Sequence, residues 1–285
     1  MEKATIEKKL LERITDIATL PFVVRKLMAT LSNPRSSARD LGKVIMSDQA
    51  LSTKVLRLTN SAYYGLAQEI TNINHAVAVL GLNTLRSMTL SIASHSAFFK
   101  GEGCPFFDRK KLWLHSLGTA ICARVLARHF GLATYEDFFA AGLIHDVGKV
   151  IVDQYAPMLF HNVIMLTIKE KITFYEAEQR VLGITHPEIG KEAALKWCFP
   201  SFLIDAIANH HDPIKAGRSW EAASIIHLAN YFCKLKEIGE SGDQCPPVLD
   251  QSVEKAININ SKALENIFAD IDKDFKNSQA FIDMI

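Results

Sequence analysis

Apolar residues recur at three- and four-residue spacing through most of the 285-residue chain. This period is that of amphipathic α-helices that bury one face, and no stretch predicts a convincing strand or an internal repeat. We therefore expect an all-α fold. The expected helices lie, in chain order, within 5–32 (two helices interrupted at Leu20-Pro21), 36–47, 49–60, 73–80, 82–99, 108–130, 136–153, 157–169, 174–182, 186–197, 200–211, 220–236 and 247–285 (two helices).

The helical pattern is interrupted most clearly at Gly101-Glu102-Gly103-Cys104-Pro105, where glycine and proline favour a turn or loop. We take this segment as the boundary between two packed helical subdomains, residues 1–100 and 101–240. A helical tail, residues 241–285, is expected to follow them. The first subdomain and the tail are expected to offer a docking surface for a partner.

Composition narrows the class of protein. Hydrophobic residues make up 48% of the chain, which predicts a substantial core. Lys and Arg number 32 against 31 Asp and Glu, a balance that does not indicate nucleic acid or an anionic membrane as a partner. Five cysteines without a CxxC pair indicate reduced thiols, and we find no signal peptide or membrane-spanning stretch. A cytoplasmic location is therefore expected.

An apolar run ending in His145-Asp146 carries the most distinctive chemistry, and Gly142 and Gly148 flank this pair. Neighbouring residues on a helix point roughly 100° apart, so this imidazole and carboxylate could contact one ion from two sides. The glycines would let another backbone or a ligand approach closely. Lys149, one turn further on, could meet an anion bound there. The alternative is a solvated polar pair without a function.

Other histidines lie on separate predicted helices before and after this pair. Each has an ordinary alternative: a core residue at His115, a helix cap at His186, and a solvated helix end at His210-His211. Together they form a pattern that chance produces much less easily, and an imidazole-rich set favours iron, zinc or manganese over magnesium or calcium. The candidate metal ligands are His115, His145, Asp146, His186, His210 and His211.

This order resembles that of the HD superfamily of metal-dependent phosphohydrolases. The stretches 185–190 and 209–211 are similar to its cyclic-di-GMP phosphodiesterase branch, but the Gly-Tyr-Pro loop of that branch is missing. Asn230 stands where the superfamily has a last Asp ligand, which makes it a weaker candidate ligand. Lys111 stands where some members carry a Glu ligand.

The first half resembles the HDOD family. The similarity extends over about residues 10–235, with Asn60-Ser61-Ala62-Tyr63-Tyr64-Gly65 as its most distinctive segment and Gln49 as a departure, since Pro is common there. HDOD proteins are bacterial signalling or regulatory modules, usually without demonstrated catalysis. The resemblance implies a helical bundle joined to an HD-like helical bundle.

The residues of this segment also have a structural interpretation, which we favour over a contact with a ligand. Asn60 and Ser61 can end a helix through hydrogen bonds from the side chain to the backbone. Tyr63 and Tyr64 can cover the core, and Gly65 can adopt a positive φ.

Three functions remain open. We favour a signalling module that acts through contacts with a protein partner and binds metal without catalysis. The alternative is a metal-dependent phosphohydrolase that acts on a cyclic dinucleotide or another nucleotide, with Lys149 steadying a phosphoryl oxygen. Binding of nucleic acid has only scattered basic residues in its favour. Arg57 and Arg86 could bind an anion such as phosphate, but we favour surface residues or residues that bridge helices. Self-association could use the same apolar faces.

Charge decides between the first two functions. Neutral imidazoles and the single carboxylate of Asp146 supply one negative charge, whereas two divalent cations bring four positive ones. Close cations need anionic bridges to offset their repulsion. Asn230 leaves only a neutral oxygen donor. We therefore expect a mononuclear or empty site, rather than the paired metals that cleave phosphodiesters.

Overall fold

The computed structural model describes residues 26, 30, 37–99, 102–257 and 259–283. Within these residues the chain is helical and contains no strand, which confirms the all-α prediction. The two helices expected within 5–32 lie almost entirely outside the described residues. The elements are α3 (Ala38–Met46), α4 (Gln49–Thr59), α5 (Ile73–Phe98), α6 (Arg109–His129), α7 (Tyr135–Ile144), α8 (Val147–Tyr155), α9 (Pro157–Glu170), α10 (Phe174–Val181), α11 (His186–Lys196), α12 (Ser201–Asn209), the 3₁₀-helix η1 (Pro213–Ser219), α13 (Trp220–Leu235), α14 (Gln251–Ala256), α15 (Ser261–Asn277) and α16 (Gln279–Ile282).

Side-chain caps explain where several helices begin. Ser37 forms a capping box at the start of α3, and Thr173 and Thr185 do the same for α10 and α11. Asp48 and Asp108 accept hydrogen bonds from the first backbone N–H groups of α4 and α6. Because these caps satisfy donors that have no partner inside the helix, short polar residues specify the helix starts.

The helix predicted over 136–153 is wrong as a single element, because α7 ends at Ile144, the backbone leaves helical geometry at Asp146 (ψ 14°), and α8 begins at Val147. Nδ1 of His145 lies 2.7 Å from the Gly142 carbonyl oxygen, a backbone acceptor that a continuous helix would use itself. The predicted close approach of the glycines is confirmed: a Cβ on Gly142 would lie 2.7 Å from Cα of Ala120, and a Cβ on Gly148 would overlap the His186 carbonyl. The pair therefore stands at a tightly packed junction.

Two further differences concern α5 and the tail. The helices expected on either side of Gly81 form one element, α5, with a kink at Gly81, whose φ is 81°. The tail holds three helices, α14, α15 and α16, instead of two. Both changes reflect boundaries set by local backbone geometry and leave the predicted helical character intact.

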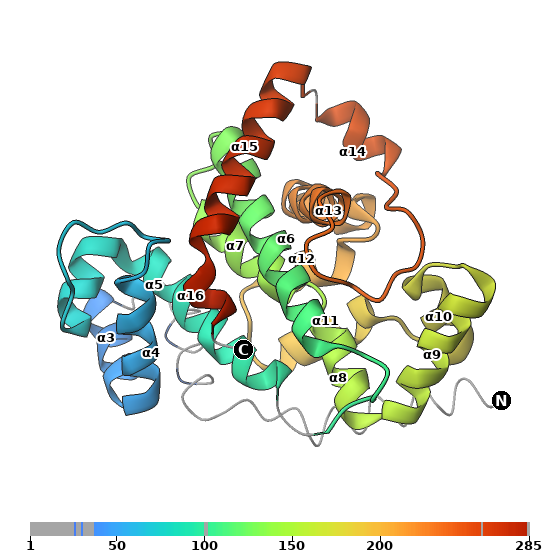
Figure 1. Ribbon diagram of the computed structural model, residues 1–285, viewed down its shortest axis with the longest axis horizontal. Helices are drawn as coiled ribbons and strands as arrows, with labels where there is room; N and C mark the ends of the chain where they lie inside the picture. The colour runs from blue at the N-terminus through green and yellow to red at the C-terminus, as the bar shows by residue number, and fades with distance from the viewer. Residues whose placement is uncertain (1–25, 27–29, 31–36, 100–101, 258, 284–285) are drawn as a thin grey trace.

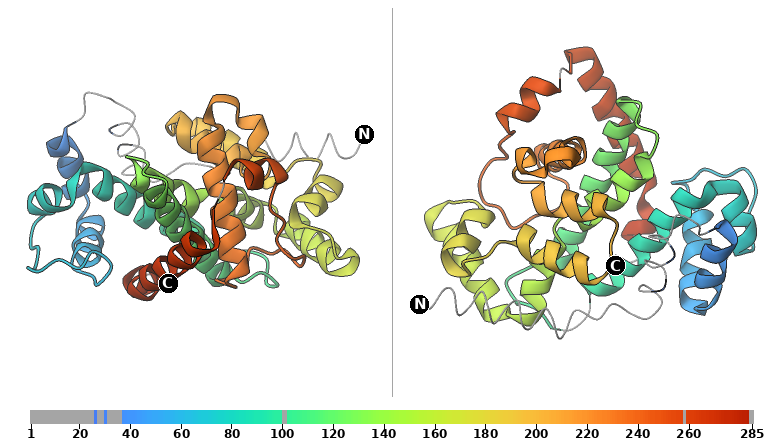
Figure 2. Two further views of the ribbon diagram at one scale, coloured as in Figure 1. Left: turned by 90° about the horizontal axis from the view of Figure 1, so that it is seen from above. Right: turned by 180° about the vertical axis from the view of Figure 1, so that it is seen from behind.

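The helices form a central group with a smaller group at each end (Figure 1). Helices α6, α7 and α13 pack against one another in the centre. Helices α3 and α4 lie at one end with the start of α5, and α9 and α10 lie at the other, as the views from above and behind also show (Figure 2). One buried core extends from α3 to α7 and on to α13 and α15, and a second lies among α8, α9, α10 and α11.

The Asn60–Gly65 segment has the structural role we favoured. The side-chain amide of Asn60 donates to the Ile70 carbonyl (2.8 Å) and accepts from the Ile70 N–H (2.7 Å), and Ser61 donates to the Leu58 carbonyl (2.6 Å). Gly65 has a φ of 58°, and Tyr63 packs against the core. The segment thus closes the loop after α4.

A buried ion-pair group joins α6, α7 and α15, and the Tyr63 ring of the first half packs on it. The Arg124 guanidinium of α6 lies 2.9 Å from Asp274 of α15 and 3.6 Å from Glu136 of α7, beneath the Tyr63 ring at 4.3 Å. Arg86 makes a second link, to Asp137 of α7 (3.7 Å). Arg57 lies 3.9 Å from the exposed carboxylate of Asp283. Arg86 thus bridges two helices and Arg57 lies at the surface, the two roles favoured over anion binding.

The structure shows no disulfide among the five cysteines, all of which lie in the described part of the chain. Among the described helices we find none with both the length and the hydrophobicity that crossing a bilayer requires.

Candidate metal centre

The six predicted ligands come from four places in the fold. His115 lies in α6, His145 and Asp146 lie between α7 and α8, His186 begins α11, and His210 and His211 follow α12 directly. His211 is partly buried and the other five are buried. The structure brings all six together from segments up to 96 residues apart, since the first is residue 115 and the last is residue 211.

Asp146 stands at the centre of this cluster. Its Oδ2 lies 3.5 Å from Nε2 of His145 and 3.8 Å from Nε2 of His115. Its Oδ1 lies 3.1 Å from Nε2 of His186 and 3.7 Å from Nε2 of His210. Burial alone would raise the pKa of the Asp146 carboxyl, but the Lys149 ammonium beside it and the hydrogen bond from His186 hold that pKa well below its ordinary range. The centre therefore carries one carboxylate among imidazoles.

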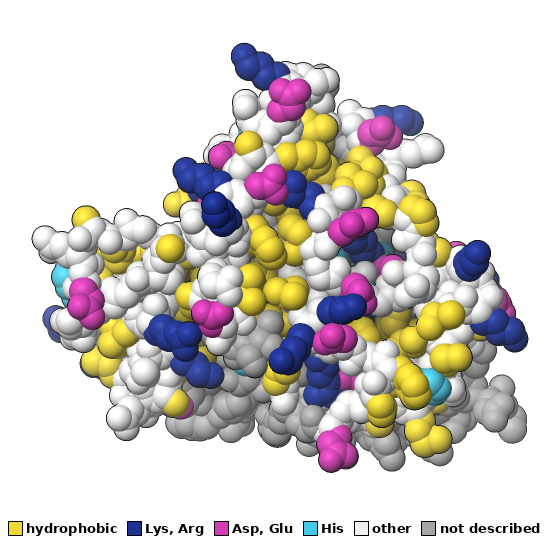
Figure 3. Space-filling view, in the orientation of Figure 1, with side chains coloured by type: hydrophobic (Ala, Val, Ile, Leu, Met, Phe, Trp, Pro, Cys, Tyr) yellow, Lys and Arg dark blue, Asp and Glu magenta, His cyan; other side chains and the backbone are white. Residues whose placement is uncertain are grey.

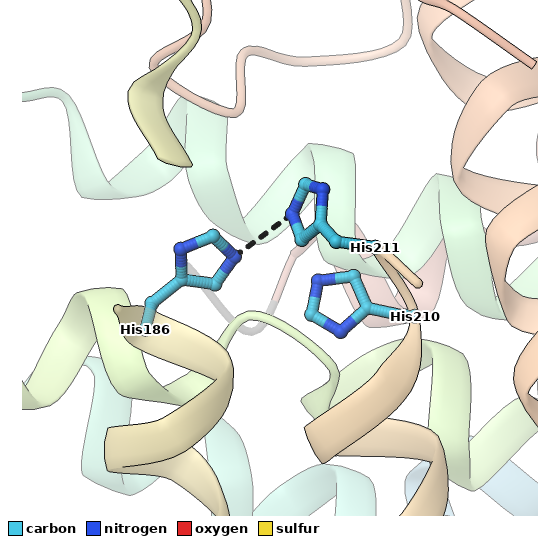
Figure 4. A group of neighbouring side chains, drawn as sticks. All are labelled: His186, His210 and His211. Carbon is cyan, nitrogen blue, oxygen red and sulfur yellow. Dashed lines mark hydrogen bonds between the residues drawn. The ribbon is translucent and has the colours of Figure 1, made fainter. Parts of the chain in front are cut away.

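The ligand atoms form two groups, His115–His145–Asp146 and His186–His210–His211, and in each group they lie within 4.8 Å of one another. The rings of the second group project toward one another from the start of α11 and the end of α12 (Figure 4). Nε2 of His186 lies 3.1 Å from Nε2 of His211. Two ring nitrogens face each other at this distance only when a proton lies between them or an ion draws both lone pairs together.

The orientation of the rings fits a metal. Nδ1 of His145 faces the Gly142 carbonyl (2.7 Å) and Nδ1 of His210 faces the Ile207 carbonyl (2.8 Å), while Nδ1 of His115 faces the Cys233 thiol (3.5 Å). Within the described chain, Nε2 of each of these three histidines is buried without a hydrogen-bond partner. Metal-binding histidines use one ring nitrogen for the protein in this way and present the other to the ion.

The protonation states of these three histidines also suit metal binding. Burial lowers the pKa of His115 to about 3 and that of His210 to about 4, and it lowers the pKa of His145 well below its usual value. These imidazoles are therefore neutral near pH 7. A metal binds the neutral form, since the proton and the ion compete for the same lone pair.

Lys149 does not have the exposed position that contact with an external anion would need. Its ammonium is buried, donating to Asp146 Oδ2 (2.8 Å) and to the Ser241 carbonyl (2.9 Å) above the Phe174 ring. The lysine that could have met an external anion is thus committed to the central carboxylate and to the chain after α13. The physical reason is the high cost of leaving a buried ammonium without a partner.

Glu178 was missed by the sequence analysis. It lies in α10, is fully buried, and accepts hydrogen bonds from the backbone N–H of His186 (2.9 Å) and from its Nδ1 (2.6 Å). The one available signal was its place on the apolar face of the 174–182 helix, beside Phe174 and Ala177. A charge on such a face is expected to have a buried partner.

A cavity of about 610 Å³ adjoins the cluster, and His211 and Asn230 are among its lining residues. Figure 3 shows this face hollowed between α10, α13 and the chain that follows α13, with Lys or Arg and His atoms inside. Asn230 is buried, and its Oδ1 has no hydrogen-bond partner among the described residues. Lys111 lies away from the cluster in an exposed ion pair with Glu240.

Both lysines that line this cavity are paired within the protein. Lys215 lies 2.9 Å from Asp212, and Lys234 lies 2.5 Å from Asp243. Glu176 and Asp250 add two further carboxylates to the wall. The cavity therefore offers an incoming phosphate no unpaired lysine.

Comparison with known proteins identifies the family of the chain and solved structures with the same fold. A family model described as the HDOD domain matches residues 17–213. The solved structure of an HDOD domain protein from Geobacter sulfurreducens is 29% identical with a TM-score of 0.76, covering 99% of this chain and 96% of that one. A candidate phosphohydrolase from Shewanella amazonensis SB2B has the same fold, at 24% identity and a TM-score of 0.73, covering 96% of both chains.

Two other relatives extend the comparison. A candidate signal transduction protein from Marinobacter aquaeolei VT8 shares the fold at 20% identity and a TM-score of 0.76, covering 99% of this chain and 64% of that one. An uncharacterized protein of Treponema pallidum (strain Nichols) is 28% identical over 237 residues, 82% of this chain and 45% of that protein. The chain thus spans less than half the length of this curated relative.

Proposed function

This chain belongs to the HDOD domain family, and from that premise we propose that it is a cytoplasmic signalling module that binds one transition metal and acts through protein contacts without hydrolysing phosphodiesters. The observation that carries the proposal is the cluster of buried imidazoles around a single carboxylate, Asp146. The free cysteines agree with a reducing compartment.

The proposed ligands are those predicted from the sequence: His115, His145, Asp146, His186, His210 and His211. A bound divalent ion would supply Lewis acidity and a fixed positive charge. The protein's own part is to hold the imidazole lone pairs toward one space and to exclude water from it. Imidazole-rich surroundings favour iron, zinc or manganese.

The charges of the centre support a lack of hydrolysis. Asp146 already shares its Oδ2 with the Lys149 ammonium, so its negative charge is largely offset before any ion binds. A second divalent ion would need further anionic ligands. Asn230 provides none, and the paired lysines of the cavity leave little attraction for a phosphodiester.

Signalling through contacts is supported by exposed apolar side chains. Met158, Met165 and Ile168 lie at spacings that place them on one face of α9, and all three are exposed. Exposed apolar faces are typical of protein–protein contacts. A protein partner or a second copy of the chain could use this face, and the first subdomain and the tail remain our other proposed docking surface.

The alternative is a phosphohydrolase that acts on a cyclic dinucleotide or another nucleotide, favoured by the retention of all six candidate ligands. The test is incubation of the protein with added Mn²⁺ or Fe²⁺ and a panel of phosphodiesters that includes cyclic di-GMP. We expect no turnover. Turnover by the wild type that disappears in a His145→Ala/Asp146→Ala variant would establish the alternative.

Asn230→Asp tests whether position 230 contributes to the metal centre. The substitution adds a carboxylate beside the cavity where the superfamily carries a ligand, and we expect metal affinity to rise severalfold because the new charge attracts the ion. Affinity is measured by competition with a metal-chelating dye. Asn162→Asp, on the exposed surface of α9, adds the same charge at a distance and is expected to change nothing. Equal affinities in both variants would show that position 230 is remote from the ion.

A further inference from the structure

We infer that Glu178 is a positioning residue that sets the metal affinity of the centre through His186. The inference rests on the proposed function, since it concerns the metal that this function requires. It adds a second carboxylate to the site, one that holds a ligand and does not itself face the ion.

The contacts of Glu178 fix both the backbone and the ring of His186. A single oxygen, Oε2, accepts from the His186 N–H at 2.9 Å and from Nδ1 at 2.6 Å. The Nδ1 contact is the shortest that any ring nitrogen of the six-residue cluster makes with the protein among the hydrogen bonds of the described chain. With Nδ1 held by Glu178, Nε2 on the other side of the ring must face Asp146, 3.1 Å away, and His211.

The packing around the ring leaves it little freedom to turn. Phe174 and Tyr175 contact it edge-on, with ring centroids 6.1 and 6.4 Å away. The backbone of His186 is held against Gly148, where a Cβ would collide with the His186 carbonyl. The ring is therefore fixed from α8 and α10 as well as from its own helix.

A role in capping α11 does not account for Glu178. The start of α11 already has a capping box, in which Glu188 accepts hydrogen bonds from the N–H (2.8 Å) and hydroxyl (2.7 Å) of Thr185. Burying a carboxylate costs several kcal/mol unless a positive partner compensates it. A fully buried Glu178 is therefore a costly way to hold one more N–H group, and a cheaper polar side chain would serve.

The partners of the other histidines show what the carboxylate adds. Nδ1 of His145 and His210 faces neutral backbone carbonyls, and Nδ1 of His115 faces a thiol. Among these four histidines, His186 is the one whose Nδ1 faces a carboxylate. An anionic acceptor on Nδ1 makes the opposite nitrogen a stronger donor to a metal and compensates the charge of the ion. Glu178 thus supplies, through His186, part of the negative charge that the ligands themselves lack.

The experiment compares Zn²⁺ affinity, measured by competition with a chelating dye, in the wild type and in Glu178→Gln. The amide keeps the shape and one acceptor but removes the charge, and we expect affinity to fall about 10- to 100-fold. Glu265→Gln is the matched control, because Glu265 is exposed on α15 and is not among the residues that line the cavity. It is expected to bind Zn²⁺ like the wild type.

A double-mutant cycle separates positioning from a merely structural role. In a His186→Ala background, Glu178→Gln is expected to change Zn²⁺ affinity by less than about twofold, because the ring through which it acts is gone. An equal loss in both backgrounds would mean that Glu178 only stabilises the fold, and would overturn the inference. If Glu178→Gln does not fold, Glu178→Asp replaces it. The shorter carboxylate is expected to weaken Zn²⁺ binding, and wild-type affinity in that variant would overturn the inference.

The remaining outcomes distinguish the inference from the proposed function. Equal Zn²⁺ affinities in the wild type and in Glu178→Gln would overturn the inference but leave the proposed function intact. A wild type that binds no Zn²⁺, Mn²⁺ or Fe²⁺ overturns the proposed function and the inference with it.

Discussion

Replacing Arg124 by alanine is expected to lower the free energy of unfolding by about 3–5 kcal/mol, the cost of leaving a buried partner charge uncompensated. Arg124 is buried and pairs with Asp274 (2.9 Å) and Glu136 (3.6 Å) on two other helices. Its guanidinium also lies over the Tyr63 ring. The substitution would therefore loosen the joint between the first half, the centre and the tail. Urea denaturation followed by circular dichroism measures the loss.

Arg128→Ala is the matched control, because Arg128 also pairs with Asp274 (2.8 Å) but is largely exposed. Exposed pairs contribute about 0–1 kcal/mol, so this variant should unfold close to the wild type. Similar losses in the two variants would contradict the importance of the buried group.

The loss in Arg124→Ala should also depend on pH. Burial raises the pKa of Glu136, and Arg124 opposes that rise. Without Arg124 the pKa rises further, and the folded state then binds a proton more tightly than the unfolded state. The stability of the variant relative to the wild type should therefore recover as pH falls from 7.5 toward 5. A loss that grows over this range would show that Glu136 is not the uncompensated charge.

Replacing His145 by alanine is expected to lower bound metal severalfold. His145 supplies one of the three ligand atoms of the His115–His145–Asp146 group, and its Nε2 is oriented toward that group by the Gly142 carbonyl. Removing one ligand weakens the site, and the cavity left behind admits water as a poorer replacement. Metal content is measured by mass spectrometry after purification without chelators. His75→Ala is the control, because it removes a histidine at an exposed position of α5 outside the cluster.

Unchanged metal content in His145→Ala would show that the ion, if present, is bound elsewhere. Loss of metal in both variants would point instead to adventitious binding by surface histidines. Circular dichroism of each variant establishes that the helices are retained.

Local signals account for what the sequence could predict. Ser37, Asp108 and Thr185 mark helix starts because their side chains bond to backbone groups a few residues away. The order of the histidines along successive helices, together with its resemblance to a known family, pointed to one cluster. The spacing of these residues along the chain could not by itself prove that they converge.

The features that sequence reasoning missed depend on contacts between distant segments. The break at His145-Asp146 follows from a side-chain contact with Gly142 and from the packing of Gly148 against His186. The periodicity of the apolar residues reveals neither of these contacts, because the apolar pattern continues through the break. Lys149 was considered as a contact for a bound anion, but its ammonium donates to Asp146 and to the carbonyl of Ser241, 92 residues further on.

Glu178 is the most instructive omission. As a charged residue on an apolar helix face it could have been flagged, but nothing in its spacing connects it with His186, which begins the next helix. Only the packing of α10 against the start of α11 makes it part of the centre. Partners of this kind, unlike ligands, have no fixed position in a motif.

The most direct test of the proposed function is the metal content of the wild-type protein, purified without chelators and analysed for iron, zinc and manganese. A single transition metal for each chain is expected, because Asp146 is the one carboxylate among the candidate ligands and already shares its charge with Lys149. No metal, even after incubation with all three ions, would contradict metal binding. Two ions for each chain, both lost in His145→Ala, would contradict the mononuclear centre and favour a hydrolase.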